Sequence, residues 1–532
     1  MTEIDNDPFQ GTPPWPRGST RRAMLMVPLA LACTGLPEAV LAQQPDFATL
    51  LRTVLGEGKS FDPNTLVEVA RQLARRSYMA PNTDLPDNLR NLTFEQYQAI
   101  HIHRRDRVWD AEGRGFVVEP LHRGFVYQSP VTIYTVEDGT IRRLAYDVSR
   151  FDFGAIAPPA QAELDFSGFR VLYRDRGAEE TREVASFQGA SFFRGLAKGQ
   201  VPGLLARGLT LRPADARGEE FPLFRAFWIE RPNVLADEIV VHALLDSESV
   251  CGAYRFTIRP RDETIIDVES TIFARNVLDH VGYGAIAGMF FLGAASHRLD
   301  DDVRPEVHDA NGLQLHTGQD EWIWRPLTNP ETLQISVFSD QNPKGFGLLQ
   351  RLRDAVAYQD DEKSFERRPS LWIEPIGDWA EGAVQLLEIP STNETNPNIL
   401  TYWRPKTQIA AGSQTSFALR QYWTWSSPDR PDDATVRLTR TGQGSVQNRR
   451  RFIVEFGSSR FTEHAAIAAI SAAASASKGK ITDVRLTPHL DRKVMRVSFE
   501  FDPGGESLCE LHLVLIENGK IASETWLYRW TS

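Results

Sequence analysis

Carboxylate and tryptophan side chains are concentrated in one segment of the sequence, residues 339–403. The segment contains Asp360 and Glu394 together with Trp372, Trp379 and Trp403. Aromatic rings pack on the C–H faces of sugars, sugar hydroxyls need carboxylate or arginine partners, and cleavage of a glycosidic bond needs two carboxyl groups. The segment therefore predicts a carbohydrate ligand, although most carboxylates in a segment of this kind are simply solvated.

A second group of candidate residues lies upstream, in the motif Arg-Pro-Glu-Val-His-Asp at 304–309. Asp309 could serve as a general base, with His308 as the neighbour that tunes it. The commoner fate of such a histidine is to be half-buried and hydrogen-bonded. Both interpretations of His308 stay open at this point.

Other kinds of catalytic centre lack their sequence signatures. There is no G-x-S-x-G motif for a nucleophilic serine, no glycine-rich phosphate loop and no C-x-x-C metal spacing. His101 and His103 have no third ligand nearby in the sequence, and we interpret them as surface residues. We therefore expect neither a metal nor a cofactor.

The elements that position these residues are predicted to be mainly β-strands. From about residue 116 to 425, short apolar runs alternate with period two and are broken by Gly, Pro, Asn and Asp, which is typical of a large antiparallel β-sandwich. One helix is expected over 64–74, with Asn64 as its N-cap. Its apolar face has a 3.6-residue period and consists of Leu66, Val69, Ala70 and Leu73.

The domain organisation follows from shifts in composition. We expect an N-terminal β-sandwich over 43–425, a linker rich in Pro, Asp, Gly and Arg over 426–450, and a C-terminal domain over 451–532. The strand-like runs of the last part suit a small immunoglobulin-like sandwich. The stretch 465–477, which is nearly all Ala, Ser and Ile, predicts one short helix.

The first 42 residues have the features of a secretory signal peptide. Arg21 and Arg22 precede an apolar stretch at 23–36, and Ala42 offers a small residue for cleavage. Paired arginines indicate the twin-arginine export route, and 14 residues between Arg22 and Pro37 are too few for a membrane span. A lipidated Cys33 is the less favoured alternative. The mature chain is expected in the periplasm, without membrane insertion.

Composition and charge exclude several classes of function. Hydrophobic residues make up 42% of the 532 residues and charged residues 24%, as in ordinary globular proteins. The net charge of −11 makes nucleic acid a poor candidate ligand. Removal of the leader leaves Cys251 and Cys509. They could form a disulfide in an oxidising compartment, but nothing in the sequence pairs them and we expect two buried free thiols.

The chain resembles the osmoregulated periplasmic glucan biosynthesis proteins, members G and D, over essentially the whole mature sequence, and the leader looks like that of the D member. The motifs that carry the resemblance are 186–194 (SFQGASFFR), 243–247 (ALLDS), 324–330 (WRPLTNP), 342–350 (NPKGFGLLQ), 358–360 (YQD), 368–375 (RPSLWIEP) and 523–528 (SETWLY).

The resemblance implies a fold and a ligand. It implies a large β-sandwich of the galactose-mutarotase type with a long cleft, followed by an immunoglobulin-like domain. The implied ligand is the β-1,2-linked glucose backbone of a periplasmic glucan, with the membrane glucan synthase as a possible partner. Some family members are similar to inverting β-1,2-glucan hydrolases, and others are similar to transglycosylases that close the glucan into a ring.

Carried over position by position, the family's base-side aspartate matches Asp309. The family's general acid falls in 388–399 (EIPSTNETNPNI), where this chain has Pro397, and proline cannot transfer a proton. Glu394 is the first candidate to replace that acid, followed by Asp360 or Asp378. A tyrosine of the preceding loop is Phe365 in this chain.

Two functional interpretations remain open. The first is an inverting β-1,2-glucanase or transglycosylase with Asp309 as base and Glu394 as acid. The retained Asp309 and the intact motifs around it favour this interpretation, which is the one we prefer from the sequence. The second is a non-catalytic protein that binds the glucan and shapes its backbone, which Pro397 favours. Because an acidic protein repels anionic substituents, either form is expected to act on the bare backbone. The residues expected to bind substrate are Tyr358, Arg368, Trp372, Trp379 and Trp403.

Overall fold

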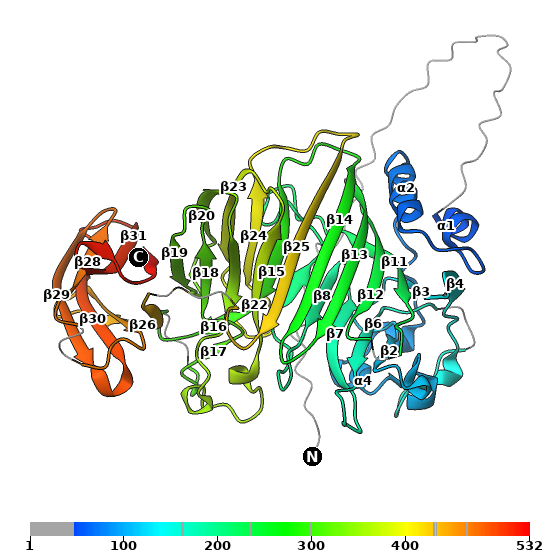
Figure 1. The fold of residues 1–532 in the computed structure, drawn as a ribbon, viewed down its shortest axis with the longest axis horizontal. Helices are drawn as coiled ribbons and strands as arrows, with labels where there is room; N and C mark the ends of the chain where they lie inside the picture. Colours follow the sequence, from blue (N-terminus) through cyan, green and yellow to red (C-terminus); the bar gives the residue numbers. More distant parts are fainter. Residues whose placement is uncertain are drawn as a thin grey trace, which may run out of the picture.

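The computed structural model describes residues 47–160, 164–234, 236–296, 301–428, 431, 433–463 and 467–532, so the predicted signal peptide lies outside the described residues. The fold is mainly β, as predicted, with two large sheets and a smaller C-terminal sheet (Figure 1). The galactose-mutarotase type of sandwich stays a prediction.

The first large sheet is antiparallel and follows the strand order β2-β6-β7-β8-β9-β15-β24-β23-β20, with β10 beside β15. Its strands are β2 (Phe116–Leu121), β6 (Gly168–Tyr173), β7 (Arg182–Gln188), β8 (Phe192–Gly195), β9 (Leu205–Arg207), β10 (Thr210–Leu211), β15 (Val281–Gly288), β20 (Gln334–Gln341), β23 (Glu381–Glu388) and β24 (Ile399–Pro405).

The second large sheet follows the order β28-β31-β33-β19-β18-β21-β22-β25-β14-β13-β12-β11-β3-β4, with β32 beside β31. Its strands are β3 (Thr132–Glu137), β4 (Thr140–Arg143), β11 (Leu223–Glu230), β12 (Ile239–Asp246), β13 (Val250–Pro260), β14 (Thr264–Ala274), β18 (Gly312–His316), β19 (Trp322–Pro326), β21 (Gly345–Leu349), β22 (Ser370–Ile376), β25 (Gln414–Thr424), β28 (Ile470–Ala476), β31 (Leu508–Glu517), β32 (Lys520–Ile521) and β33 (Thr525–Thr531).

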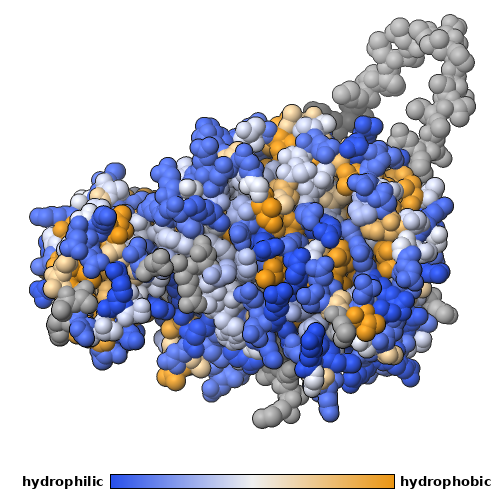
Figure 2. Space-filling view, viewed as in Figure 1, coloured by the Kyte–Doolittle hydropathy of each residue, from blue (hydrophilic) through white to orange (hydrophobic). Residues whose placement is uncertain are grey.

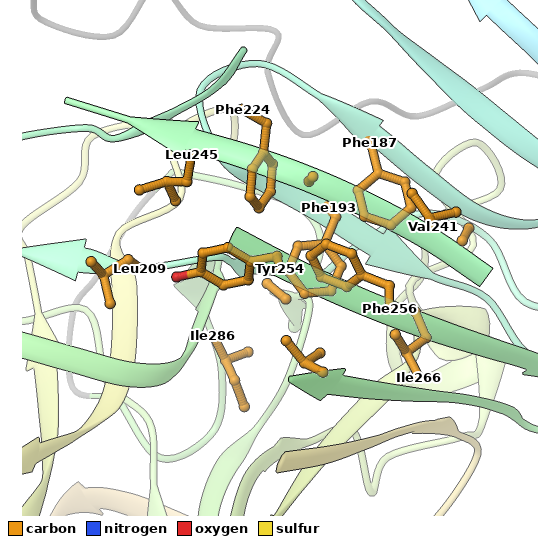
Figure 3. Packing of buried hydrophobic residues seen from close by; sticks show 14 of the residues in the cluster. Phe187, Phe193, Leu209, Phe224, Val241, Leu245, Tyr254, Phe256, Ile266 and Ile286 are labelled. Carbon is orange, nitrogen blue, oxygen red and sulfur yellow. The ribbon is translucent and has the colours of Figure 1, made fainter. Parts of the chain in front are cut away.

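The main core lies between these two sheets (Figure 3). Phe187 on β7 and Phe193 on β8 contact Phe256 on β13 edge-on, with ring centroids 5.0 and 5.1 Å apart. Such pairs each add about 1 kcal/mol beyond the burial of their area. On the face shown in Figure 2 hydrophilic residues predominate and hydrophobic ones are scattered among them, because the apolar sides of the strands face this core.

Two N-terminal helices, α1 (Phe47–Leu55) and α2 (Pro63–Ala74), pack against the outer side of the second sheet. The predicted apolar face of α2 is buried, which confirms that prediction. The N-cap is Asp62 rather than Asn64, because Pro63 begins the helix and the carboxylate of Asp62 accepts from the Asn64 N–H. Trp228 on β11 donates its indole N–H to the Leu55 carbonyl at 3.1 Å.

Short elements complete the fold. These are α3 (Asp87–Arg90), α4 (Phe94–Gln98), the strand pair β1 (His101–Ile102) and β5 (Phe151–Asp152), the strand pair β16 (Phe290–Leu292) and β17 (Val307–His308), and the 3₁₀ turns Arg104–Asp106, Asp110–Glu112, Val148–Arg150, Ala355–Ala357, Phe365–Arg367 and Leu490–Arg492. Among the described residues no helix is long and apolar enough to span a membrane.

The C-terminal part is a second sandwich, at the left of Figure 1. A sheet of β26 (Thr435–Gln443), β27 (Arg450–Gly457), β30 (Val494–Asp502) and β29 (Lys480–His489) packs on β28, β31 and β33. β33 pairs in parallel with β19, so the C-terminal strands continue the second large sheet. Their shared core includes Trp324, Leu349 and Trp372 of the main sandwich.

Two sequence expectations for this region differ from the structure. β26 lies inside the predicted linker 426–450, so the C-terminal unit begins before residue 451. The helix predicted over 465–477 is wrong, because β28 occupies most of that stretch and pairs with β31. Cys509 in this unit and Cys251 in the main sandwich are buried free thiols, as predicted.

Candidate functional site

Asp309 follows β17 and is completely buried. Its Oδ1 accepts from the guanidinium of Arg368, and its Oδ2 accepts from the backbone N–H of Met289 at 2.8 Å. Arg368 is itself buried, and its guanidinium lies 4.4 Å from the centre of the Phe365 ring. The candidate base is therefore held as one half of an enclosed ion pair.

His308 is also buried, and both of its ring nitrogens have partners. Gln350 Nε2 lies 3.2 Å from Nδ1, and its two hydrogens are shared among Nδ1 and two carbonyl oxygens. Because an amide nitrogen donates and does not accept, Nδ1 is the acceptor. Nε2 therefore carries the proton and donates to Glu306 Oε2 at 3.1 Å. The ring stacks on Phe290, with centroids 5.2 Å apart. This environment fits the hydrogen-bonded, buried histidine that the sequence left open.

Arg304 brings together the other candidate carboxylates. Its guanidinium pairs with Asp302, with Asp360 at 2.9 Å and with Glu394. Burial alone would raise the pKa of Asp360, but the backbone N–H groups of Lys363 and Glu362 and the Arg304 charge outweigh it, so the pKa lies below its usual value. Asp360 is thus ionised at neutral pH, the state opposite to that of a general acid.

These two clusters lie at the same end of the main sandwich, near β16 and β17 in Figure 1. Tyr358 joins them, because its ring contacts both His308 and Phe365, at 5.4 and 5.8 Å between centroids, and it stands two residues before Asp360. Its hydroxyl donates to the Leu352 carbonyl, and burial raises its pKa. The loop of Glu394 joins as well, since Asn398 accepts from the Phe290 N–H at 2.8 Å.

The three predicted tryptophans are not part of this cluster. Trp379 and Trp403 lie in the main core, with ring centroids 6.2 Å apart, and Trp372 lies in the core shared with the C-terminal sandwich. Each indole is at most 7% exposed. These side chains are buried in this structure, so their ring faces are not open to a sugar.

The tryptophan that does reach the surface beside the site is Trp425, which is 38% exposed. Its indole N–H donates to the Lys198 carbonyl at 3.1 Å, and the Arg353 guanidinium lies 5.0 Å from its ring. Arg353 in turn donates to the carbonyls of Glu366 and Arg368. The sequence signal that could have singled out Trp425 is its place at the end of a strand, directly before Ser-Ser-Pro.

No local sequence pattern marks Arg304 as a site residue, because its three partners are spread over some 90 residues. Pro397 lies half-buried in the loop between β23 and β24, close in sequence to Glu394. Within the part of the chain that the structure describes, no group of three His, Cys, Asp or Glu side chains is placed to hold a metal.

Comparison with known proteins places this architecture in a family. The family described as "Periplasmic glucan biosynthesis protein, MdoG" matches residues 61–530. The chain is 44% identical over 474 residues to glucans biosynthesis protein G of Rhodopseudomonas palustris, which covers 89% of this chain and 94% of the relative. It is 41% identical over 514 residues to the protein of the same name from Bradyrhizobium diazoefficiens, which covers 96% and 99% of the two chains. A third relative of that name, from Vibrio cholerae, is 42% identical over 479 residues, 89% of this chain and 87% of its own. The chain therefore belongs to the MdoG family of periplasmic glucan biosynthesis proteins.

Proposed function

We propose that this protein acts in periplasmic glucan biosynthesis by binding the β-1,2-linked glucose backbone and shaping it. Family membership supports the glucan, since the relatives compared above are named for glucan biosynthesis. The observation that carries the choice of binding over cleavage is that three candidate catalytic carboxylates, those of Asp309, Asp360 and Glu394, are each paired with an arginine. Asp309 pairs with Arg368, while Asp360 and Glu394 share Arg304.

This pairing matters because inverting cleavage needs two carboxyl groups in different states. One must hold a proton beside the leaving oxygen, and the other must reach an attacking water. Asp309 has no exposed surface for that water, and Asp360 is held ionised. Pro397, at the position that matches the family's acid, has no proton to give.

Paired charges suit a neutral polysaccharide. The side chains of Arg304 and Glu394, which are 20% and 23% exposed, can exchange hydrogen bonds with sugar hydroxyls at the rim of the site. The exposed face of Trp425 can pack on a sugar ring. The same acidic surface disfavours anionic substituents, so the bare backbone is the proposed ligand.

The proposed setting is the periplasm. The leader that the sequence predicts directs the chain there by the twin-arginine route, and the mature chain works outside the membrane. The membrane glucan synthase is the proposed partner, because it is the source of the nascent backbone on which a binding protein of this kind acts.

The second candidate function is an inverting β-1,2-glucanase or transglycosylase. It is favoured by the convergence of Asp309, Asp360 and Glu394 on loops at one end of the sandwich. In this case Glu394 must leave Arg304 and take up a proton, and a relay of waters must connect Asp309 to the bond being cleaved.

The test is to incubate the mature protein with linear β-1,2-glucan, to measure binding by calorimetry and to resolve the products by mass. Asp309→Asn is the test variant, and Asp361→Asn, at an exposed carboxylate of the neighbouring loop, is its matched control. Binding with an unchanged glucan supports the proposal. Shorter or cyclic products that disappear only in Asp309→Asn establish the second candidate instead. A glucan that is neither bound nor changed overturns both.

A further inference from the structure

Glu524, in the C-terminal sandwich, is completely buried and accepts four hydrogen bonds. Arg351 donates to both of its oxygens at 2.7 and 2.8 Å, Gln314 on β18 donates at 2.6 Å, and the Val436 N–H donates at 2.8 Å. Two of these donors, Arg351 and Gln314, belong to the main sandwich. A buried carboxylate with a bidentate arginine fixes the relative position of the segments that it joins.

Arg351 links Glu524 to the segment beside the candidate site. Its backbone N–H donates to Asn311 Oδ1 at 2.8 Å, and the Asn311 N–H donates to the Leu349 carbonyl at 3.0 Å. Gln350, which lies between Leu349 and Arg351, donates to Nδ1 of His308. The segment 349–351 is thus held between Glu524 on one side and residues 308–311 on the other.

A second route reaches His308 from its opposite nitrogen. The Tyr528 hydroxyl on β33 donates to the Ala295 carbonyl at 2.7 Å, and the Thr441 N–H on β26 donates to the Ala294 carbonyl at 3.0 Å. The Ala294 N–H in turn donates to Glu306 Oε1 at 3.2 Å, and Glu306 Oε2 accepts from His308 Nε2.

From the first route we infer that Glu524 and Arg351 are positioning residues, and from both routes that the C-terminal sandwich is part of the frame that holds His308 and Asp309 in place. The inference rests on the proposed function, because that function makes the region around His308 and Asp309 a glucan-binding site. It extends that function, because it assigns the C-terminal sandwich a task in glucan binding. The partners of the two ring nitrogens, Gln350 and Glu306, are each linked through one further residue, Arg351 or Ala294, to the C-terminal sandwich. Loosening the sandwich is therefore expected to loosen the residue next to Asp309.

The experiment compares Glu524→Gln with Glu455→Gln in the full chain. Glu455 is the matched control, because its side chain is 4% exposed and pairs with Arg492 and Arg496 inside the C-terminal sandwich. Amide hydrogen exchange is followed by mass spectrometry in peptides covering 289–296 and 306–311, and the affinity for linear β-1,2-glucan is measured alongside. Arg351→Lys, which keeps the charge but loses the two-pronged contact, is the second variant in case Glu524→Gln does not fold.

We expect exchange in both peptides to be about tenfold faster in Glu524→Gln or Arg351→Lys, and glucan binding to be weaker by a similar factor. Glu455→Gln leaves both quantities as in the wild type. Unchanged exchange in the two peptides when the Arg351 contact is broken overturns the inference, and so does equal acceleration in Glu455→Gln. If the wild type binds no glucan, the proposed function has failed, and the exchange data still decide the positioning role.

Discussion

Asp309 and Arg368 form an ion pair in which both side chains are buried and the carboxylate also accepts from the Met289 N–H. Removing one partner of such a pair leaves an uncompensated charge in the interior. The effect of breaking the pair on the free energy of unfolding can therefore be measured without any knowledge of the ligand.

We predict that Asp309→Asn lowers the free energy of unfolding by about 3–5 kcal/mol, because Arg368 then lies buried without a counter-charge. Denaturant unfolding at pH 7 measures the change. The double variant Asp309→Asn with Arg368→Met should recover part of the loss, since it removes the stranded charge as well. A single variant as stable as the wild type would show that the pair is open to water in solution.

We predict that Arg304→Gln lowers the free energy of unfolding by an amount that depends on pH. The pKa values of Asp302 and Asp360 lie below their usual range in the folded state, so their contribution is present above pH 4 and is lost as the pH falls through the folded values. We expect a loss of about 2 kcal/mol at pH 7 that shrinks at pH 3. Urea unfolding at the two pH values tests this. The exposed pair Lys406–Glu381 supplies the control variant Lys406→Gln. A difference in unfolding free energy between wild type and Arg304→Gln that is the same at both pH values contradicts the prediction.

His122 should make the protein less stable in mild acid. Burial, together with the neighbouring Arg123 charge, lowers its pKa to about 4, although its Nδ1–H donates to the Arg123 carbonyl. The unfolded chain takes up a proton near pH 6.5, so stability falls between pH 6.5 and 4, by about 3 kcal/mol at most. His122→Gln should flatten this decline, measured by denaturant unfolding at pH 7 and 4.5. The exposed His101→Gln should leave the decline unchanged.

Substitution of Trp425 should affect mainly glucan binding, and substitution of Trp403 should affect mainly stability. Trp425→Ala removes a partly exposed ring, so we expect weaker glucan binding with a smaller loss of stability than in Trp403→Ala. Trp403→Ala removes a fully buried ring and should cost about 3–5 kcal/mol of stability. Calorimetric titration and denaturant unfolding of both variants measure the two effects. Equal glucan affinity of Trp425→Ala and the wild type would remove Trp425 from the site.

The sequence predicted the class of fold and the helix α2 because both depend on local periodicity. It misassigned β28 for a related reason. The stretch is rich in alanine, which favours helices, yet Ala472 and Ala474 pack on the C-terminal core and the backbone pairs with β31. Tertiary contacts override such propensities.

The site was predictable only in part. Asp309, Glu394 and Asp360 stand in recognisable motifs, and the structure brings them to one end of the sandwich. Their arginine partners are up to 90 positions away, and no local pattern specifies such pairings. The burial of Trp372, Trp379 and Trp403 could not be predicted from the sequence for the same reason, because it depends on which side of each strand faces a distant sheet.

The parallel pairing of β33 with β19 has a consequence for the order of folding. Thr525 donates to Glu321 across 204 positions of the chain, and contacts that close such long loops form slowly. We therefore expect the frame around His308 to be completed late in folding, and until β33 pairs with it β19 has an unprotected edge. Binding of a ligand would then indicate that the whole chain has folded.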